Sequence, residues 1–193
     1  MTNPPSKPEE QELLARIATG DETAMKALYE RYASPLQYFV QSWLPDVHEA
    51  ADVMHEAMLA VWGNAASFRN QSSVKSWVFG IARNKAIDRV RAAVRLVPTE
   101  PERFDEETDE VGDVHQLVLA MQRSQVVRDC IDGLSDTHKR AVHLAFFEDM
   151  PYAEIAEVEA CPVGTVKSRI LYAKQLIARC VSLKTGRDEG DIR

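Results

Sequence analysis

Residues 151–174, PYAEIAEVEACPVGTVKSRILYAK, constrain the fold of this chain more than any other segment. The first half has one apolar side, formed by Ile155, Ala156 and Val158, and Pro162 prevents the chain from continuing as a single helix. In the second half, apolar residues recur at the spacing of one buried helical stripe, at Val166, Ile170, Ala173 and Ile177. The segment therefore predicts a helix-turn-helix, a motif that lays its second helix in the major groove of DNA.

The outward face of the predicted second helix is polar and basic. At about 100° per residue, the residues opposite the apolar stripe are Gly164, Ser168, Leu171, Tyr172 and Gln175. Lys167 and Lys174 flank this face. Any amphipathic surface helix would show the stripe, so the stripe alone does not indicate DNA binding. The turn, together with a run over 161–187 that contains no acidic residue, favours a helix that contacts DNA.

Charge is unevenly distributed along the chain. The 193 residues include 23 basic and 30 acidic ones, a net charge of −7, which by itself argues against nucleic-acid binding. Two segments reverse that balance, because 69–95 holds seven basic residues and one acid, and 161–187 holds six basic residues. Between them, 100–113 holds eight acidic residues and one basic residue. Two basic modules joined by an acidic segment are typical of a protein that contacts DNA at two places.

Length and residue usage exclude several classes of protein. A chain of 193 residues with 45% hydrophobic residues can form one large or two small folded domains. The apolar runs are too short to cross a bilayer, and the polar, acidic first residues predict no signal peptide. Cys130, Cys161 and Cys180 have no C-x-x-C spacing, so we expect no zinc knuckle or disulfide framework, and a reducing cytosol as the compartment.

No set of residues predicts catalysis or a cofactor. The sequence has no glycine-rich phosphate loop, no nucleophile elbow and no cluster of metal ligands. His48 and His55 are seven positions apart, a separation too wide to converge well on one metal ion. We therefore predict a protein that is not an enzyme and that uses neither a metal nor another cofactor.

Almost every segment has helical periodicity and none has clear β alternation, so the predicted fold class is all-α. Capping residues and helix breakers set the bounds of the elements, for example a capping-box spacing at Ser6 and Glu9, and N-caps at Asp21, Asp46 and Ser135. The predicted helices are 11–19, 22–32, 36–43, 47–64, 73–97, 116–131 and 136–147, followed by the helix-turn-helix.

The predicted helix 47–64 carries an acidic line, Glu49, Asp52 and Glu56, beside an apolar line. Such a line is most often an ordinary solvated face. The alternative is a docking surface for a basic partner.

The predicted helix 73–97 is also two-sided. Its apolar side consists of Phe79, Ala82, Ala86, Val90 and Ala93. The other side consists of Trp77, Asn84, Asp88, Arg91 and Arg95. Asn and Arg at those positions can hydrogen-bond bases or phosphates. An exposed Trp77 could stack on an unpaired base, but we expect it to pack in the core instead.

Three segments together resemble the extracytoplasmic-function sigma factors of the bacterial sigma-70 family. They are HEAADVMHEAMLAVWGNAASF (48–68), SVKSWVFGIARNKAIDRVRA (73–92) and LSDTHKRAVHLAFFEDMPYAEIAEVEACPVGTVKSRILYAKQLI (134–177). The resemblance implies two small helical domains on a flexible acidic linker: a σ2-like domain over 1–97, the linker over 98–115, a σ4-like domain over 116–185 and a tail over 186–193. It also implies a cytoplasmic protein that binds core RNA polymerase, through the β′ clamp helices and the β flap, as well as promoter DNA and an anti-sigma factor.

The resemblance further implies a role for individual residues. Glu49, Asp52 and Glu56 fall in the polymerase-binding segment. The residues that fall in the −10 reading and melting segment are Phe68, Arg69, Asn70, Arg83, Asn84, Asp88, Arg89 and Arg91. Those that fall on the −35 recognition helix are Thr165, Lys167, Ser168, Arg169, Leu171, Tyr172 and Lys174. The acidic linker falls where the family's linker threads the polymerase cleft.

The sequence departs from the family pattern at several of these places. Ala51 and His55 stand where an acid and a Gln are frequent, Glu159 and Ala160 replace an apolar residue and Gly at the turn, and Tyr172 stands where a basic residue is frequent. Two other interpretations stay open from the residues alone. One is a stand-alone helix-turn-helix regulator that binds an operator as a dimer, and the other is an adaptor that binds partners but no DNA.

Overall fold

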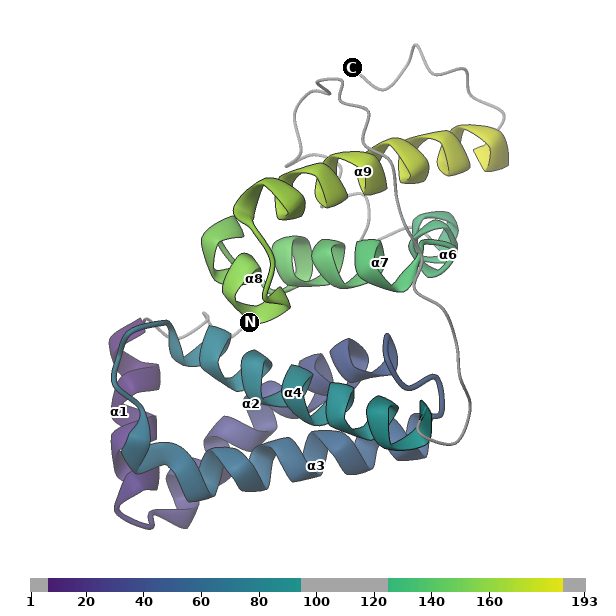
Figure 1. Cartoon of the computed structure of the whole chain (residues 1–193). Coiled ribbons are helices and arrows are strands. Elements are labelled where there is room, and N and C mark those ends of the chain that lie inside the picture. Colours follow the sequence, from purple (N-terminus) through teal and green to yellow (C-terminus); the bar gives the residue numbers. More distant parts are fainter. Residues whose placement is uncertain (1–6, 95–124, 186–193) are drawn as a thin grey trace. The chain divides into compact units, whose positions relative to one another are not determined.

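The computed structural model describes residues 7–94 and 125–185, and all regular structure in those two ranges is helical (Figure 1). The chain divides into two compact units, and the main division falls between α4 and α6. The all-α prediction is confirmed for the described part of the chain. The acidic linker, the tail and the predicted domain boundaries lie outside the described residues.

The first unit is a helical bundle around an aromatic core. It consists of α1 (Lys7–Ala18), α2 (Glu22–Gln41), α3 (Val47–Asn64), the short 3-10 helix η1 (Ala65–Ser67) and α4 (Val74–Val94). Figure 1 shows α2, α3 and α4 lying lengthwise beside one another, while α1 crosses one end of the bundle near η1. Tyr32 and Phe39 of α2 both pack edge-to-face on Phe79 of α4, at ring-centroid distances of 6.3 and 5.2 Å.

Two of the predicted N-cap residues cap the first turn of their helices. The carboxylate of Asp21 accepts hydrogen bonds from the backbone N–H of Thr23 and Ala24, and that of Asp46 accepts from His48 and Glu49. The hydrogen bonds from Ala24 and from Glu49 are the main reasons why the pKa of each capping carboxyl lies below its ordinary value. The predicted capping box at the chain start includes Ser6, which lies outside the described residues.

The prediction of two helices over 22–32 and 36–43 was wrong, because α2 runs through Pro35 without a break. Proline removes one backbone hydrogen bond and usually kinks or ends a helix, at a cost of about 3 kcal/mol. Here Tyr32, Leu36 and Phe39 lie on one buried face on both sides of the proline. Burying several large side chains contributes about 1.5–3 kcal/mol each, so tertiary packing outweighs the local preference.

The second unit packs smaller aliphatic side chains around its longest helix. It consists of α6 (Gln125–Asp132), α7 (Asp136–Val142), a π-helical turn η2 (His143–Phe147), α8 (Tyr152–Glu159) and α9 (Val163–Thr185). Figure 1 shows α9 running along α7 and towards α6, and α9 packs on both. The predicted buried stripe of the recognition helix is confirmed at all four positions: Val166, Ile170, Ala173 and Ile177.

Some predicted element bounds need correction. The helix predicted over 136–147 becomes π-helical after Val142. Of the helix predicted over 116–131, only the part from Gln125 is described. The apolar side of α4 ends at Ala86, because Val90 is half-buried and Ala93 is exposed.

The prediction that the cysteines form no disulfide framework needs correction, because one disulfide is present. Cys130 of α6 and Cys180 of α9 are bonded to each other, and Cys161 is not part of this bond. The two bonded cysteines are 50 positions apart in sequence, but the packing of α6 on α9 brings their Cα atoms to 5.8 Å, a separation that a disulfide spans. Spacing along the chain could not show this contact. Within 7–94 and 125–185, no three His, Cys, Asp or Glu residues are grouped to hold a metal ion.

Candidate polymerase and DNA interfaces

The predicted acidic line lies on the outer surface of α3. Ala50, Val53 and Ala57 are fully buried against the rest of the bundle, so the acids on the adjoining face point outward. Asp52 and Glu56 are exposed and Glu49 is half-buried. This surface can meet a basic partner without any change in the fold.

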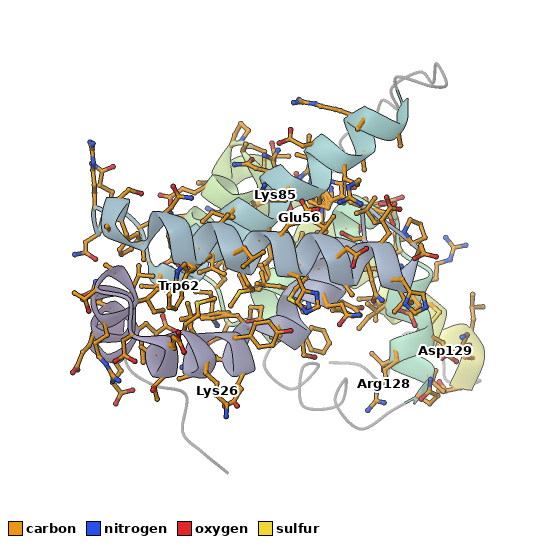
Figure 2. The ribbon with its side chains drawn as sticks, turned by 90° about the horizontal axis from the view of Figure 1, so that it is seen from below. Lys26, Glu56, Trp62, Lys85, Arg128 and Asp129 are labelled. Carbon is orange, nitrogen blue, oxygen red and sulfur yellow. A yellow bond between two sulfur atoms is a disulfide. The ribbon has the colours of Figure 1, made fainter. Side chains whose placement is uncertain are left out.

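Two of the three acids are already paired within the chain. Arg89 of α4 places Nη2 2.6 Å from Glu56 Oε1 and Nη1 3.6 Å from Glu49 Oε1. Figure 2 shows Glu56 on α3 beside α4, which carries the labelled Lys85. Asp52 has no ion pair within the part of the chain that the structure describes. A residue predicted to contact DNA thus contacts the predicted polymerase-binding line, a pairing that sequence reasoning missed because it depends on how α4 is rotated against α3.

His55, one of the departures from the family pattern, is held by a neighbouring helix. Its Nε2 lies 2.8 Å from the hydroxyl oxygen of Tyr29 on α2, and the two rings stack with centroids 5.9 Å apart. The ring therefore forms a fixed part of the surface next to Asp52. His48 is exposed in the first turn of α3.

The predicted −10 residues occupy the loop before α4 and the outer side of that helix. Arg69, Asn70, Asn84, Asp88 and Arg91 are exposed. Asn70 adopts a left-handed backbone conformation with φ of 55°, which Asn tolerates better than most residues and which turns the loop sharply.

Phe68 and Arg83 are less accessible than the other −10 candidates. Phe68 packs on Trp77 with ring centroids 5.2 Å apart, and both rings are half-buried, so Trp77 packs on a neighbour at the surface and not in the core as expected. The Arg83 Nε atom is buried and has no hydrogen-bond partner among the described residues.

The predicted −35 residues on the outward face of α9 differ in exposure and in the contacts that they make. Lys167 is exposed, whereas the Ser168 hydroxyl donates a hydrogen bond to the Thr165 carbonyl at 3.1 Å. Arg169 is half-buried, with Nη1 3.8 Å from the Cys161 sulfur. Lys174 lies over the ring of Phe146, 5.6 Å from its centroid, and partial burial lowers the pKa of its ammonium group.

Tyr172 contacts a residue that sequence reasoning did not select. Its ring lies 5.3 Å from the imidazole of His138 on α7. Ser135 occupies the predicted N-cap position of α7, but its hydroxyl makes no capping hydrogen bond. The hydroxyl oxygen instead lies 2.5 Å from His138 Nδ1. The three-residue spacing of Ser135 and His138 could have indicated that their side chains meet one helical turn apart. The contact between His138 and Tyr172 could not be predicted in this way, because it depends on tertiary packing.

Comparison with known proteins agrees with this geometry. The family "Sigma-70 region 2" matches residues 28–96, and "Sigma-70, region 4" matches residues 124–177. The ECF RNA polymerase sigma-E factor of Escherichia coli is 31% identical over 176 residues, which cover 87% of this chain and 92% of that protein. The chain belongs to the extracytoplasmic-function sigma factors of the sigma-70 family.

Other relatives of this sigma factor span the same regions. The RNA polymerase sigma-H factor of Pseudomonas aeruginosa is 30% identical over 181 residues, covering 90% of this chain and 94% of the relative. The ECF RNA polymerase sigma factor SigK of Mycobacterium ulcerans is 29% identical over 185 residues, covering 94% and 98%. These matches confirm the predicted alternative sigma factor over a stand-alone regulator or an adaptor.

Two solved structures share the fold of this sigma factor. The structure of CnrH in complex with the cytosolic domain of CnrY matches with a TM-score of 0.61 and 21% identity, over 90% of this chain and 97% of that one. The co-crystal structure of RpoE with the anti-sigma factor NepR from Bartonella quintana matches with a TM-score of 0.60 and 22% identity, over 82% and 96%. Among the described helices of this sigma factor, none has the length and hydropathy required to cross a membrane.

The turn of the helix-turn-helix shows how this sigma factor accommodates a departure from the family pattern. Ala160 has a φ of 50°, the left-handed region in which glycine is favoured. The preceding Glu159 is buried rather than exposed. The chain therefore keeps the backbone path that glycine usually provides, although an alanine occupies the position.

Proposed function

We propose that this sigma factor binds core RNA polymerase through the outer surface of α3 and directs the enzyme to promoters. It reads the −10 element with α4 and the preceding loop, and the −35 element with α9. The polymerase performs the chemistry, and the sigma factor itself is not an enzyme. The observation that carries the proposal is the acidic line of α3 beside the basic helix α4 in one unit, because an operator-binding regulator needs no such pair.

Asp52 is the centre of the proposed polymerase contact. It is exposed and unpaired among the described residues, whereas Glu49 and Glu56 share Arg89. A basic partner, the β′ clamp helices by family resemblance, would meet Asp52 directly and would compete with Arg89 for the other two carboxylates. Complementary charges of this kind steer association and fix the register of an interface.

For the −10 element, we propose that the loop holds an unpaired base while α4 contacts the strand. Arg69 and Asn70 are exposed at the loop, and Asn84 and Arg91 are exposed on α4. Arg83 stands to gain from an acceptor such as a phosphate oxygen, because its buried Nε donor is unsatisfied among the described residues and such groups cost free energy.

For the −35 element, we propose that Ser168, Leu171 and Tyr172 select the sequence. Thr165, Lys167, Arg169 and Lys174 would mainly contact phosphates or support the helix. Phosphate contacts position a protein on DNA and carry no sequence information, whereas contacts to base edges do. The β flap would bind the same unit, as the family resemblance implies.

We also infer that an anti-sigma factor holds this protein inactive in the cytoplasm. Of the two solved structures of similar fold, one contains RpoE bound to the anti-sigma factor NepR, and the other contains CnrH bound to the cytosolic domain of CnrY. No cofactor is required for any of these contacts, because each proposed role depends on side chains alone.

Core-polymerase affinity tests the proposed docking surface. The double variant Asp52→Lys, Glu56→Lys should bind core enzyme at least several-fold more weakly, since interfacial charges left unpaired cost about 2–5 kcal/mol. Glu30→Lys is the matched control, because Glu30 is an exposed acid of the same unit that lies on α2 instead of the acidic line. Equal affinity of the double variant and the wild type would refute docking through α3.

A further inference from the structure

Tyr172 is a half-exposed aromatic residue whose position is set from outside its own helix. Its side chain is 48% exposed on α9, so one part of the ring faces solvent. The other part meets His138 of α7, with ring centroids 5.3 Å apart and an angle of 45° between the ring planes. A surface tyrosine without such a neighbour would distribute over several staggered rotamers. The contact with His138 restricts that choice.

His138 is itself well fixed. It is only 8% exposed, and its Nδ1 lies 2.5 Å from the Ser135 hydroxyl one helical turn earlier. Burial, and then the positive charge of Arg169, lower the pKa of the imidazole, which favours the neutral ring at neutral pH. The residue therefore offers Tyr172 a buried aromatic surface whose neutral form is favoured.

We propose that His138 is a specificity-determining residue for the −35 element, because it sets the direction in which the Tyr172 ring points into the DNA groove. This inference rests on the proposed function of α9. His138 acts as a positioning residue that need not contact DNA. The direction of the ring decides which base edge it reaches, for example whether its carbon edge meets the methyl group of a thymine or its hydroxyl group meets a hydrogen-bonding atom.

The chain offers a matched control for the structural effect of removing a buried histidine. His143 is also buried in the second unit, and its ring stacks on the 44% exposed Phe147 at 5.8 Å. This pair lies on η2, whereas the ring that contacts Tyr172 is that of His138 on α7. A substitution at His143 removes a similar buried ring without touching the proposed reader.

The test is transcription by core polymerase and full-length sigma factor from a promoter library with a randomised −35 element. Base preferences are read from the transcripts. We expect His138→Ala to reduce discrimination about two- to tenfold at the same base positions that Tyr172→Leu affects, the range typical of an aromatic pair. His138→Phe, which keeps a ring, should retain the wild-type profile. In a Tyr172→Leu background, His138→Ala should change the profile no further.

Two variants separate positioning from folding. His143→Ala should leave the base profile unchanged even where it lowers the melting temperature. Ser135→Ala keeps the buried imidazole and removes the hydroxyl beside its Nδ1, which also lies 3.3 Å from the Thr137 hydroxyl. It should shift the profile in the same direction by a smaller factor, and it serves if His138→Ala does not fold.

An unchanged base profile in His138→Ala would overturn the proposal, and Ser135→Ala takes its place in this test if His138→Ala does not fold. A change at base positions that Tyr172→Leu does not affect would overturn the proposal as well. A Tyr172→Leu variant with the wild-type profile would also overturn it, while leaving α9 as reader if Ser168→Ala or Leu171→Ala alters the profile. If the wild-type protein shows no −35 preference at all, the proposed function of α9 fails as well.

Discussion

The two units of this sigma factor are held together in different ways. The first unit closes around large aromatic side chains, with Tyr32 and Phe39 of α2 packed on Phe79 of α4. The second unit packs smaller aliphatic residues such as Val142, Ile170 and Ile177, and a disulfide joins α6 to α9. Small domains bury a lower fraction of their surface and more often need a cross-link. The proposed polymerase-binding unit is therefore stabilised by packing, whereas the proposed −35 unit is also stabilised by a covalent bond.

The largest expected effect comes from removing the aromatic centre of the first unit. Phe79 is fully buried, so Phe79→Ala should lower the free energy of unfolding of that unit by about 3–5 kcal/mol. Leu59→Ala is the control within the same unit, because Leu59 is 72% exposed and its loss should change stability by about 0.5 kcal/mol or less. Denaturant unfolding with probes in each unit would measure both. Similar losses in the two variants would contradict an aromatic core.

The disulfide should be the next largest contribution, and it should act on the second unit. Cys130→Ala with Cys180→Ala, or reduction of the wild type, removes a bond that joins residues 50 positions apart, and should cost about 2–4 kcal/mol. Thermal unfolding with and without reductant, alongside thiol alkylation and mass measurement, would test it. Cys161→Ala should respond to reductant like the wild type, because Cys161 is not part of the disulfide. If the bond is shown to form but reductant does not change the stability of the second unit, the disulfide does not distinguish the stability of the two units.

A buried tyrosine gives the first unit a pH dependence of its own. The Tyr32 hydroxyl donates a hydrogen bond to the buried Glu10 carboxylate, and burial, followed by this bond, raises the pKa of Tyr32 above the ordinary value of 10.0. Above that pH the unfolded chain loses the tyrosine proton while the folded chain retains it, so stability falls as pH rises. The slope attributable to Tyr32 should approach about 1.4 kcal/mol per pH unit.

Comparison with Tyr32→Phe isolates this titration from that of other groups. The variant should be less stable at neutral pH but should lose stability more slowly above pH 10.0 than the wild type. Melting temperatures of the first unit measured across that range would show it. Parallel pH curves for the two proteins would contradict a buried, protonated Tyr32.

The smallest expected effect concerns Arg89 and Arg91 of α4, two of the arginines that the family resemblance assigns to the −10 segment. Arg89 pairs with Glu49 and Glu56, and partly exposed ion pairs contribute about 0–1 kcal/mol. Arg89→Ala should therefore lower stability slightly and leave the salt dependence of promoter binding by the holoenzyme nearly unchanged. Arg91→Ala should instead reduce the salt slope by about one, since Arg91 is exposed. A larger change of slope for Arg89→Ala would show that this residue contacts DNA in the complex.

The sequence predicted those features of the fold that depend on local chemistry. Asp21 and Asp46 cap helices because a carboxylate after a turn satisfies free N–H groups. The stripe from Val166 to Ile177 was predictable because helical periodicity marks a buried face.

Features that depend on tertiary packing were not predictable. Pro35 lies inside α2 because residues distant in sequence bury its neighbours. The Cys130–Cys180 bond and the approach of His138 to Tyr172 both depend on how α6 and α7 pack on α9. Each of these contacts needs the rotation of one helix against another, which a single sequence does not contain.

Transcription by core RNA polymerase from a library with randomised −10 and −35 elements would show whether this protein selects promoters as a sigma factor. We expect transcripts from promoters with defined bases in both elements at a fixed spacing, only when the sigma factor is present. The Asp52→Lys, Glu56→Lys double variant should give few or none. The same level of initiation with and without this protein would contradict the proposed sigma-factor function. Tight binding of the protein alone, as a dimer, to a single duplex site would contradict it as well.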